Sequence, residues 1–202
     1  MKASQIGAIV LALSGLISFA ANAADAEAGK AKSATCIACH GADGNSSNPM
    51  WPSIAGQHAS YVYKQLSDFK ANRRINASMS GMVAGLSDDD MKNLAAYYET
   101  QSPRPVAFDA ELIAKGESIY RGGITETGVA ACMGCHSPSG EGNGPASWPS
   151  LKGQYPDYIV AQLQAFKQGA RANDPGKMMR NLVGRMSDME MKAVAAYIAG
   201  IQ

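Results

Sequence analysis

The sequence predicts an all-α fold built from two tandem domains that are copies of one unit. Three observations lead to this prediction. A Cys-x-x-Cys-His motif occurs twice in the 202-residue chain, and similar residues follow each copy in the same order. The apolar residues recur at the i, i+3, i+4, i+7 spacing of helices, and no stretch shows the alternation of a strand. The start of the chain has the pattern of an export signal, which belongs to neither domain.

Residues 1–23 are predicted to be a secretory signal peptide. Lys2 supplies a basic start, residues 6–20 are apolar, and a small-residue Ala-Asn-Ala cleavage site ends at Ala23. The apolar stretch is shorter than the roughly 20 residues that span a bilayer, which makes an uncleaved anchor the weaker alternative. We expect cleavage after Ala23, or else after Ala24, and a periplasmic mature protein.

The charge balance excludes one class of partner. The chain has 18 basic and 17 acidic residues, and removal of residues 1–23 takes away only Lys2, which leaves 17 of each. A nucleic-acid-binding protein would show a clustered basic face. We therefore expect no nucleic acid partner.

The internal repeat defines the domain organisation. The two Cys-x-x-Cys-His motifs begin at Cys36 and Cys132, and a Trp-Pro-Ser sequence follows each of them, at Trp51 and Trp148. Further residues match at offsets of 97 or 100: Tyr61, Gln65, Leu66, Phe69, Lys70, Ser87, Asp88, Met91, Lys92, Ala95, Ala96 and Tyr97 with Tyr158, Gln162, Leu163, Phe166, Lys167, Ser187, Asp188, Met191, Lys192, Ala195, Ala196 and Tyr197. We expect domains over 24–102 and 108–202. The linker over 103–107 contains two prolines and resists helix formation.

Each domain is predicted to contain three main helices. A short helix precedes each cysteine motif, over 26–34 and 111–120. The middle helix follows from the apolar spacing of Val62, Leu66 and Phe69, which recurs as Ile159, Leu163 and Phe166. The last helix begins at a capping box in each copy, Ser87 to Asp90 and Ser187 to Glu190.

The Cys-x-x-Cys-His motif is the attachment signature of c-type haem. Two thiols on one turn of backbone reach the two vinyl groups of one porphyrin, and the next histidine falls beneath the iron. The sequence thus predicts two covalent haem c groups, attached at Cys36, Cys39, Cys132 and Cys135. A structural zinc site needs two cysteine pairs roughly 15–20 residues apart, whereas these lie 96 apart. A thioredoxin-type pair does not require the histidines, His40 and His136, which we expect to be iron ligands.

The second iron ligand separates electron carriers from enzymes, because a haem with two protein ligands has no open position. Outside the motifs the only histidine is His58, whose repeat partner is Tyr155, and we read it as a surface residue near a helix start. Methionine remains. Two methionine pairs recur at an offset of 100, and one of them, Met91 with Met191, is explained by hydrophobic staples of the last helices.

The other recurring pair has no such structural explanation. Met79 and Met179 fall in stretches rich in glycine or polar residues, which we expect to be loops that point the side chains inward. We assign Met79 and Met179 as the second iron ligands, with Met82 and Met178 as the nearest alternatives. A methionine is more often core filler than a ligand, and the assignment therefore depends on the repeat.

A third repeated element lies between the motif and the middle helix. The carbonyl oxygens of Pro52 and Pro149 could accept the ring N–H of the histidine ligands, as groups around metal ligands commonly do. Either tryptophan before these prolines could equally be a packed turn residue. Candidates for hydrogen bonds to haem propionates are Tyr61, Tyr158, Gln57 and Gln154.

With these motifs in place, the sequence resembles the cytochrome c4 family of di-haem cytochromes. The matching segments are 36–45, 52–57, 65–66 and 79–97 in the first half, and 120–123, 132–136, 149–154, 162–163, 173–174, 179–180 and 187–197 in the second. The resemblance covers essentially all of the chain after the signal. It implies two class I cytochrome c domains related by a pseudo-twofold axis, with the haems facing across the interface. The family's iron ligands fall on His40, Met79, His136 and Met179.

The resemblance also implies a role and partners. It implies electron transfer between a quinol-oxidising complex of the cytochrome bc1 type and a terminal oxidase, often at the membrane surface. We expect a carrier and not an enzyme. The alternatives are a di-haem periplasmic oxidoreductase, of the peroxidase or thiosulfate-oxidising type, and an electron-accepting subunit of a dehydrogenase. Arg171 and Arg180 show no clear counterparts in the first half, and we expect any difference between the haems to arise there.

Overall fold

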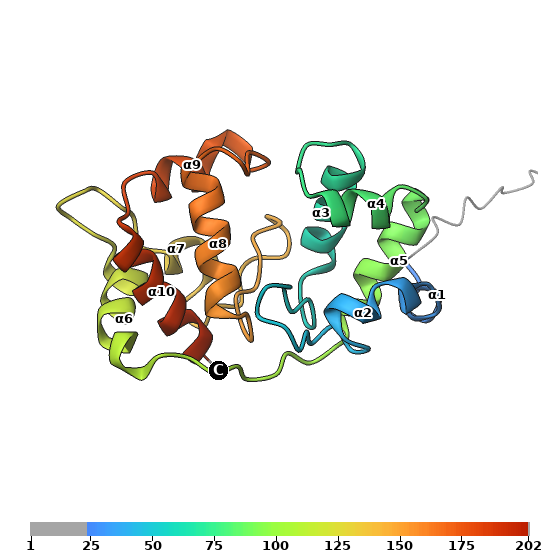
Figure 1. The fold of residues 1–202 in the computed structure, drawn as a ribbon, viewed down its shortest axis with the longest axis horizontal. Helices are drawn as coiled ribbons and strands as arrows, with labels where there is room; N and C mark the ends of the chain where they lie inside the picture. The colour runs from blue at the N-terminus through green and yellow to red at the C-terminus, as the bar shows by residue number, and fades with distance from the viewer. Residues whose placement is uncertain (1–23, 202) are drawn as a thin grey trace, which may run out of the picture.

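A computed structural model describes residues 24–201, and the prediction of a signal peptide over 1–23 lies outside these residues. Figure 1 shows two helical lobes side by side, joined along the lower edge by an extended segment without regular secondary structure. Within the described residues there are no β-strands, and only two isolated bridges occur, Ile124 with Val129 and Asn143 with Trp148. The all-α prediction is confirmed.

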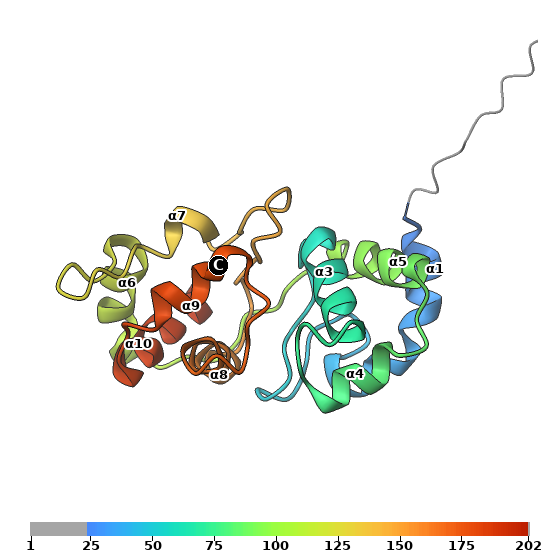
Figure 2. The same ribbon diagram turned by 90° about the horizontal axis from the view of Figure 1, so that it is seen from above.

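The two domains repeat the same order of elements. The N-terminal domain contains α1 (Ala26–Lys32), η1 (Ser33–Thr35), α2 (Ile37–His40), α3 (Ala59–Lys70), α4 (Ala77–Val83) and α5 (Asp88–Glu99). The C-terminal domain contains η2 (Ala110–Leu112), α6 (Ile113–Gly122), α7 (Met133–His136), α8 (Pro156–Lys167), η3 (Pro175–Lys177), α9 (Met178–Val183) and α10 (Asp188–Gly200). In both views α3 and α8 lie toward the opposite domain, while α1 and α6 lie on the outside (Figures 1 and 2).

The first and last helices of each domain cross at a glycine. A Cβ on Gly29 of α1 would lie 2.0 Å from the Asn93 carbonyl oxygen of α5. The matching Gly116 of α6 would place a Cβ 2.1 Å from the Ala193 oxygen of α10. Only glycine allows the helix backbones to approach this closely, so these two residues set the position of the N-terminal helix in each domain.

The last helices start as the sequence predicts. Ser87 and Ser187 each accept a hydrogen bond from the amide at the third helical position, and the carboxylates of Asp90 and Glu190 bond back to the serine amides. Met91 and Met191, which the sequence assigns to packing, are 5% and 0% exposed. Each capped helix therefore presents a buried apolar face to its domain core.

The segments that carry Met79 and Met179 are helices, and the prediction of loops there is wrong. Asn76 caps α4, because its side-chain oxygen accepts a hydrogen bond of 3.0 Å from the amide of Met79. In the second domain α9 follows a left-handed residue, Lys177, with φ of 57°. In α4 this cap outweighs the weak helix propensity of the glycine and serine residues, and in α9 the Asp174 carboxylate accepts a hydrogen bond of 3.0 Å from the amide of Arg180.

Two glutamine side chains join the domains reciprocally. The amide group of Gln57 donates to the Ser150 carbonyl at 2.8 Å, and its oxygen accepts from the Ser150 amide at 2.9 Å. Gln154 does the same with Ser53, at 2.8 and 3.0 Å. All four residues belong to the repeated Pro-Ser to Gln segments, and the exchange is therefore symmetric between the domains.

The described residues also bear on the membrane. Over 24–201, no helix combines the length and the apolar character needed to cross a bilayer.

Candidate functional site

A continuous cavity lies between the domains and is lined by both. Its wall is mainly apolar and takes in most of the residues that the sequence singles out: Cys36, His40, Met79, Cys132, Cys135, His136 and Met179. Cys39 is half-buried and is not among the lining residues. The structure thus brings together, in one space, candidate ligands from four helices, α2, α4, α7 and α9, that are far apart in the sequence.

Each cysteine motif forms a single helical turn. The amide of His40 donates to the Cys36 carbonyl at 2.9 Å, and the amide of His136 donates to the Cys132 carbonyl at 3.0 Å. All four cysteines are free of disulfides. Gly41 ends the first turn with φ of 77°, and a Cβ there would lie 2.2 Å from the Asn45 carbonyl oxygen. These turns leave both thiols of each motif available for thioether bonds.

The histidine rings are held from behind by proline carbonyls. Nδ1 of His40 lies 2.8 Å from the Pro52 oxygen, and Nδ1 of His136 lies 3.0 Å from the Pro149 oxygen. A carbonyl can only accept, so Nδ1 carries the proton and Nε2 keeps its lone pair. Burial lowers the pKa of both histidines, and the bonds to the prolines offset this only in part. The neutral imidazole that results is the form that binds a metal.

Met79, Met82, Met178 and Met179 differ in how exposed they are and in whether they line the cavity. Met79 and Met179 are half-buried and line the cavity. Met82 is 55% exposed and lies outside the cavity lining, whereas Met178 lines it but remains 44% exposed. Over residues 24–201, Met79 and Met179 are therefore the one methionine pair that is both repeated and part of the cavity lining.

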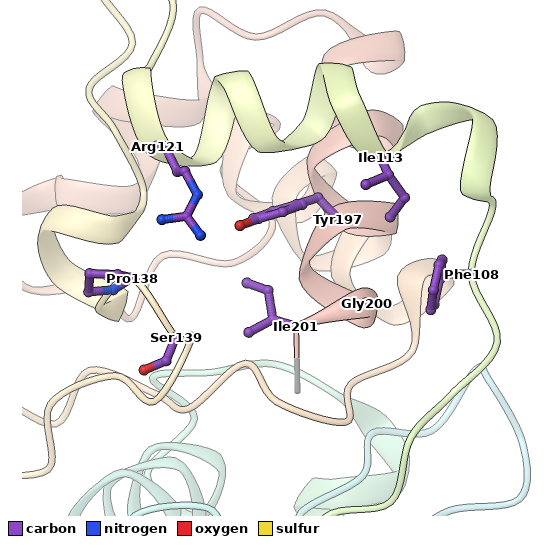
Figure 3. A pocket seen from close by; sticks show the side chains of 8 residues that line it. All are labelled: Phe108, Ile113, Arg121, Pro138, Ser139, Tyr197, Gly200 and Ile201. Carbon is purple, nitrogen blue, oxygen red and sulfur yellow. The ribbon is translucent and has the colours of Figure 1, made fainter.

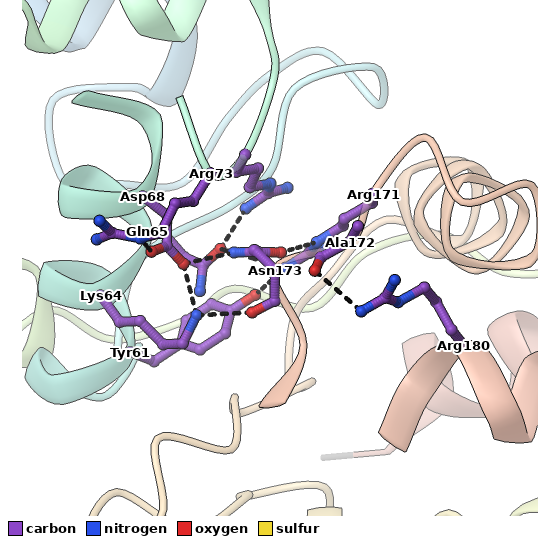
Figure 4. A network of polar contacts seen from close by, with 10 residues as sticks. Tyr61, Lys64, Gln65, Asp68, Arg73, Arg171, Ala172, Asn173 and Arg180 are labelled. Carbon is purple, nitrogen blue, oxygen red and sulfur yellow. Dashed lines mark hydrogen bonds and ion pairs between the residues drawn. The ribbon is translucent and has the colours of Figure 1, made fainter. Parts of the chain in front are cut away.

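A buried arginine from each domain contacts the opposite domain at the cavity wall. Arg74 donates to Gln65 of its own domain at 2.9 Å and to Tyr158 and Gln162 across the interface at 3.0 and 2.8 Å. Arg171 donates to Gln162 at 2.8 Å, and to Tyr61 and Gln65 across the interface at 2.9 and 3.3 Å. Figure 4 shows Arg171 facing Tyr61 and Gln65 of the other domain.

This arrangement corrects the expectation that Arg171 has no counterpart. Arg74 is its counterpart at an offset of 97, and each guanidinium stacks on a matching ring, Phe69 at 4.7 Å and Phe166 at 4.4 Å. Burial would raise the pKa of Tyr61, but Arg171 and Arg74 outweigh it and hold that pKa below its ordinary value.

Other residues also lie differently from their sequence interpretation. Gln57 and Gln154, considered for propionates, use their amide groups to join the domains. His58 is not a plain surface residue, because its Nε2 lies 2.7 Å from the Glu141 carbonyl of the other domain. Its ring is therefore part of the domain contact, and His58 is not among the residues that line the cavity.

The residues present fit two haem groups. The apolar wall suits the faces of a porphyrin, and the two repeated arginines with Tyr61 and Tyr158 supply cations and hydroxyls for carboxylates at the same wall. A buried cation without a partner is costly, which makes propionates the natural partners for Arg74 and Arg171.

A second pocket lies between α6, the C-terminal end of α10 and the segment that follows α7 (Figure 3). Phe108, Ile113, Arg121, Tyr197 and Ile201 are among its lining residues. None of the candidate haem ligands reaches it. It is therefore separate from the site.

Comparison with known proteins identifies the family. The cytochrome c family model matches residues 26–102 and again 113–202. Cytochrome c4 of Thiocapsa roseopersicina is 50% identical over 179 residues, which is 88% of this chain and 93% of the relative. The chain belongs to the cytochrome c4 family. The crystal structure of reduced recombinant cytochrome c4 from Pseudomonas stutzeri superposes with a TM-score of 0.86 at 41% identity, over 89% of this chain and 100% of that one.

Membership of the cytochrome c4 family settles the cofactor and the class of function. The protein carries two covalently bound haem c groups and transfers electrons, and it is not an enzyme. A further relative is the "thiosulfate dehydrogenase electron acceptor" of Stutzerimonas stutzeri strain A1501. It is 39% identical over 170 residues, which is 82% of this chain and 78% of the relative.

Proposed function

We propose that this cytochrome c4 carries electrons in the periplasm from a quinol-oxidising complex of the cytochrome bc1 type to a terminal oxidase. The observation that supports this role is the pairing of a histidine and a methionine from each domain on one shared cavity. An iron with two protein ligands changes its charge without binding a substrate. A protein with two such irons is suited to moving electrons between larger complexes.

The proposed attachment is the same in both domains. Cys36 and Cys39 hold the first haem, and Cys132 and Cys135 hold the second. The iron ligands are Nε2 of His40 with Sδ of Met79, and Nε2 of His136 with Sδ of Met179. A neutral thioether favours Fe(II) over Fe(III) and raises the reduction potential, which suits a carrier late in a respiratory chain.

The proposed periplasmic location is supported by the predicted signal peptide over 1–23. Within this proposal, the chain is exported and both haems are attached to the exported protein. Association with the membrane surface belongs to the same proposal, as the resemblance to the family implies.

The test is electron transfer between isolated complexes. The oxidised holoprotein is mixed with a bc1-type complex and quinol, and haem reduction is followed; the reduced protein is then mixed with a terminal oxidase. We expect both haems to be reduced and reoxidised at rates that fall with added salt if docking is electrostatic. Rapid turnover of peroxide or thiosulfate by the protein alone, with no complex present, would refute the carrier role.

A second candidate function is that of electron acceptor for a thiosulfate dehydrogenase. The similarity to the Stutzerimonas stutzeri acceptor favours it. Thiosulfate would then reduce the holoprotein only in the presence of the dehydrogenase, and the two proteins would co-purify. The respiratory role would be favoured if the bc1-type complex reduced the holoprotein as fast as the dehydrogenase does, and if the dehydrogenase did not co-purify with the holoprotein.

A further inference from the structure

A cluster of three charged residues at the domain interface is not repeated in the second domain. Asp68, Lys64 and Arg73 lie on or just after α3, and their counterparts at an offset of 97 are Ala165, Ala161 and Ala170. Around them the frame is symmetric, since each residue in the Arg74 and Arg171 contacts has a matching residue in the other domain. The N-terminal domain therefore holds a charge cluster that the C-terminal domain lacks.

The Asp68 carboxylate is nearly inaccessible, with a side chain 5% exposed. It accepts from Lys64 Nζ at 2.5 Å, from Arg73 Nε at 2.7 Å and from the Asn173 amide of the other domain at 2.7 Å. Figure 4 shows these donors converging on it. Burial would raise the pKa of Asp68, but its donors outweigh that effect and hold the pKa below its usual range. The group is ionised at neutral pH.

The cluster lies directly against the haem cavity. Lys64, Gln65 and Asn173 line that cavity, and Asp68 is one hydrogen bond behind Lys64 and Asn173. Lys64 is 27% exposed and Arg73 is 60% exposed, so water screens Arg73 far more than the other two. Of the three charges in this cluster, those of Asp68 and Lys64 therefore act most strongly on the cavity.

The C-terminal domain has an unmatched pair of its own at a different place. Asp174 accepts from the Arg180 guanidinium at 2.7 Å and from its amide at 3.0 Å, within one domain and beside Met179. In the first half, Asp174 corresponds to Ala77 at an offset of 97, and Arg180 corresponds to Ser80 at an offset of 100. The two cavity halves thus differ in where their fixed charges stand.

We propose that Asp68 and Lys64 are redox-tuning residues, whose charges act on the haem of the N-terminal domain and set it apart from the other haem. A negative charge near the iron stabilises Fe(III), which carries one more positive charge than Fe(II), and a positive charge does the opposite. Their helix, α3, also carries Val62, Leu66 and Phe69 to the cavity from the N-terminal side. The inference rests on the proposed role in electron transfer and names the residues that tune it.

The test is a redox titration of the holoprotein with substitutions of opposite sign. Asp68→Asn is nearly isosteric and should raise the potential of the N-terminal haem, shifting its reduction equilibrium about two- to tenfold, where tenfold is 59 mV for one electron. Lys64→Met should lower that potential. The matched control is Asp89→Asn, which removes an equal charge from a side chain that is 68% exposed and should leave both potentials unchanged.

The sign separates tuning from loosening of the interface. Water reaching the haem would stabilise Fe(III) and lower the potential. A lowered or unchanged potential in Asp68→Asn would therefore overturn the inference, as would an unchanged potential in Lys64→Met or an equal shift of both haems.

The haem affected is identified in Met179→His and Met79→His backgrounds, because exchange of methionine for histidine lowers the potential of the haem in that domain. Asp68→Asn should move the high-potential haem in Met179→His and move it far less in Met79→His. If neither Met179→His nor Met79→His lowers the potential of a haem, the proposed methionine ligands are wrong. The opposite signs of the potential shifts in Asp68→Asn and Lys64→Met would still decide whether these residues tune the haem. These potentials can be measured even if the protein fails to exchange electrons with the isolated complexes, so failure of the proposed function and failure of this inference can be told apart.

Discussion

In the proposed ligand set, two methionine side chains decide whether the irons of this protein can bind a further ligand. Met79 and Met179 are repeated and half-buried, and they line the same cavity as the two histidines. Met82, one turn further along α4, is mostly exposed and outside the cavity lining. The assignment therefore rests on repeat and position together, and single substitutions test it.

Met79→Ala and Met179→Ala should each remove one of two sulfur-to-iron ligands. We expect the near-infrared charge-transfer absorption of the oxidised protein, at the red end of its spectrum, to fall by about half in either variant and to vanish in the double variant, because the band requires a bound thioether. Met82→Ala is the control and should keep the full band. A full band in either single variant would remove that methionine from the ligand set.

At this scale the sequence predicts the site by repetition, and it misses what is not repeated. The proline carbonyls behind His40 and His136 recur in sequence and lie where the motif spacing suggests. The repeat does not reveal Arg74 as the partner of Arg171, because Arg74 adjoins Arg73 and the matched run ends at Lys70. Asp68 gives no sequence signal at all, since its counterpart is alanine and its donors come from two domains.

At the scale of elements, the position of each N-terminal helix depends on one glycine at a helix crossing. Sequence periodicity predicts the three main helices of each domain, because their apolar faces and caps are local features. It does not predict α4 and α9 as helices, because a turn of six or seven residues is stabilised by its cap and by packing more than by propensity. The glycines are likewise visible as important only once α5 and α10 lie against them.

Gly29→Ala should destabilise the folded holoprotein by about 1–3 kcal/mol, as overpacking of a close contact does, and Gly116→Ala should do the same in the second domain. Gly81→Ala is the matched control in α4, where an added Cβ meets nothing within 4 Å. It should be neutral or stabilising by roughly 0.5–1 kcal/mol. Urea unfolding followed by circular dichroism measures all three. Equal effects of the three substitutions would contradict the crossing geometry.

At the scale of the whole molecule, the domains are joined by bonds that sequence alone does not reveal. Gln57 and Gln154 exchange paired bonds with backbone across the interface, and Asp68 binds Asn173. Symmetric contacts of this kind favour cooperative unfolding of both domains, because separating them leaves buried polar groups without partners.

The double variant Gln57→Ala with Gln154→Ala should uncouple the domains. We expect its thermal unfolding to broaden or split into two transitions, followed at the Soret band and by calorimetry, because each domain then unfolds separately. Gln168→Ala, on the exposed end of α8, should keep the wild-type curve. An unchanged single transition in the double variant would show that the glutamines do not couple the domains.

Acid should weaken the interface through Asp68. Its pKa is depressed in the folded protein, and the stability that it provides is therefore present above the unfolded carboxyl pKa of about 3.9 and lost as pH falls through the folded value. Asp68→Asn should show a smaller loss of stability below about pH 4 than the wild type in urea titrations at several pH values. Parallel pH curves for the two proteins would contradict a depressed pKa.

The central claim is that both irons are closed by protein ligands, which makes the molecule a carrier. Carbon monoxide binds reduced haem iron only where a coordination position is open, so a carbon monoxide titration of the fully reduced holoprotein tests the claim most directly. We expect the Soret spectrum of both haems to stay unchanged at neutral pH. A carbon monoxide adduct on either haem of the wild-type protein would contradict the account, because it would show an iron open to small molecules.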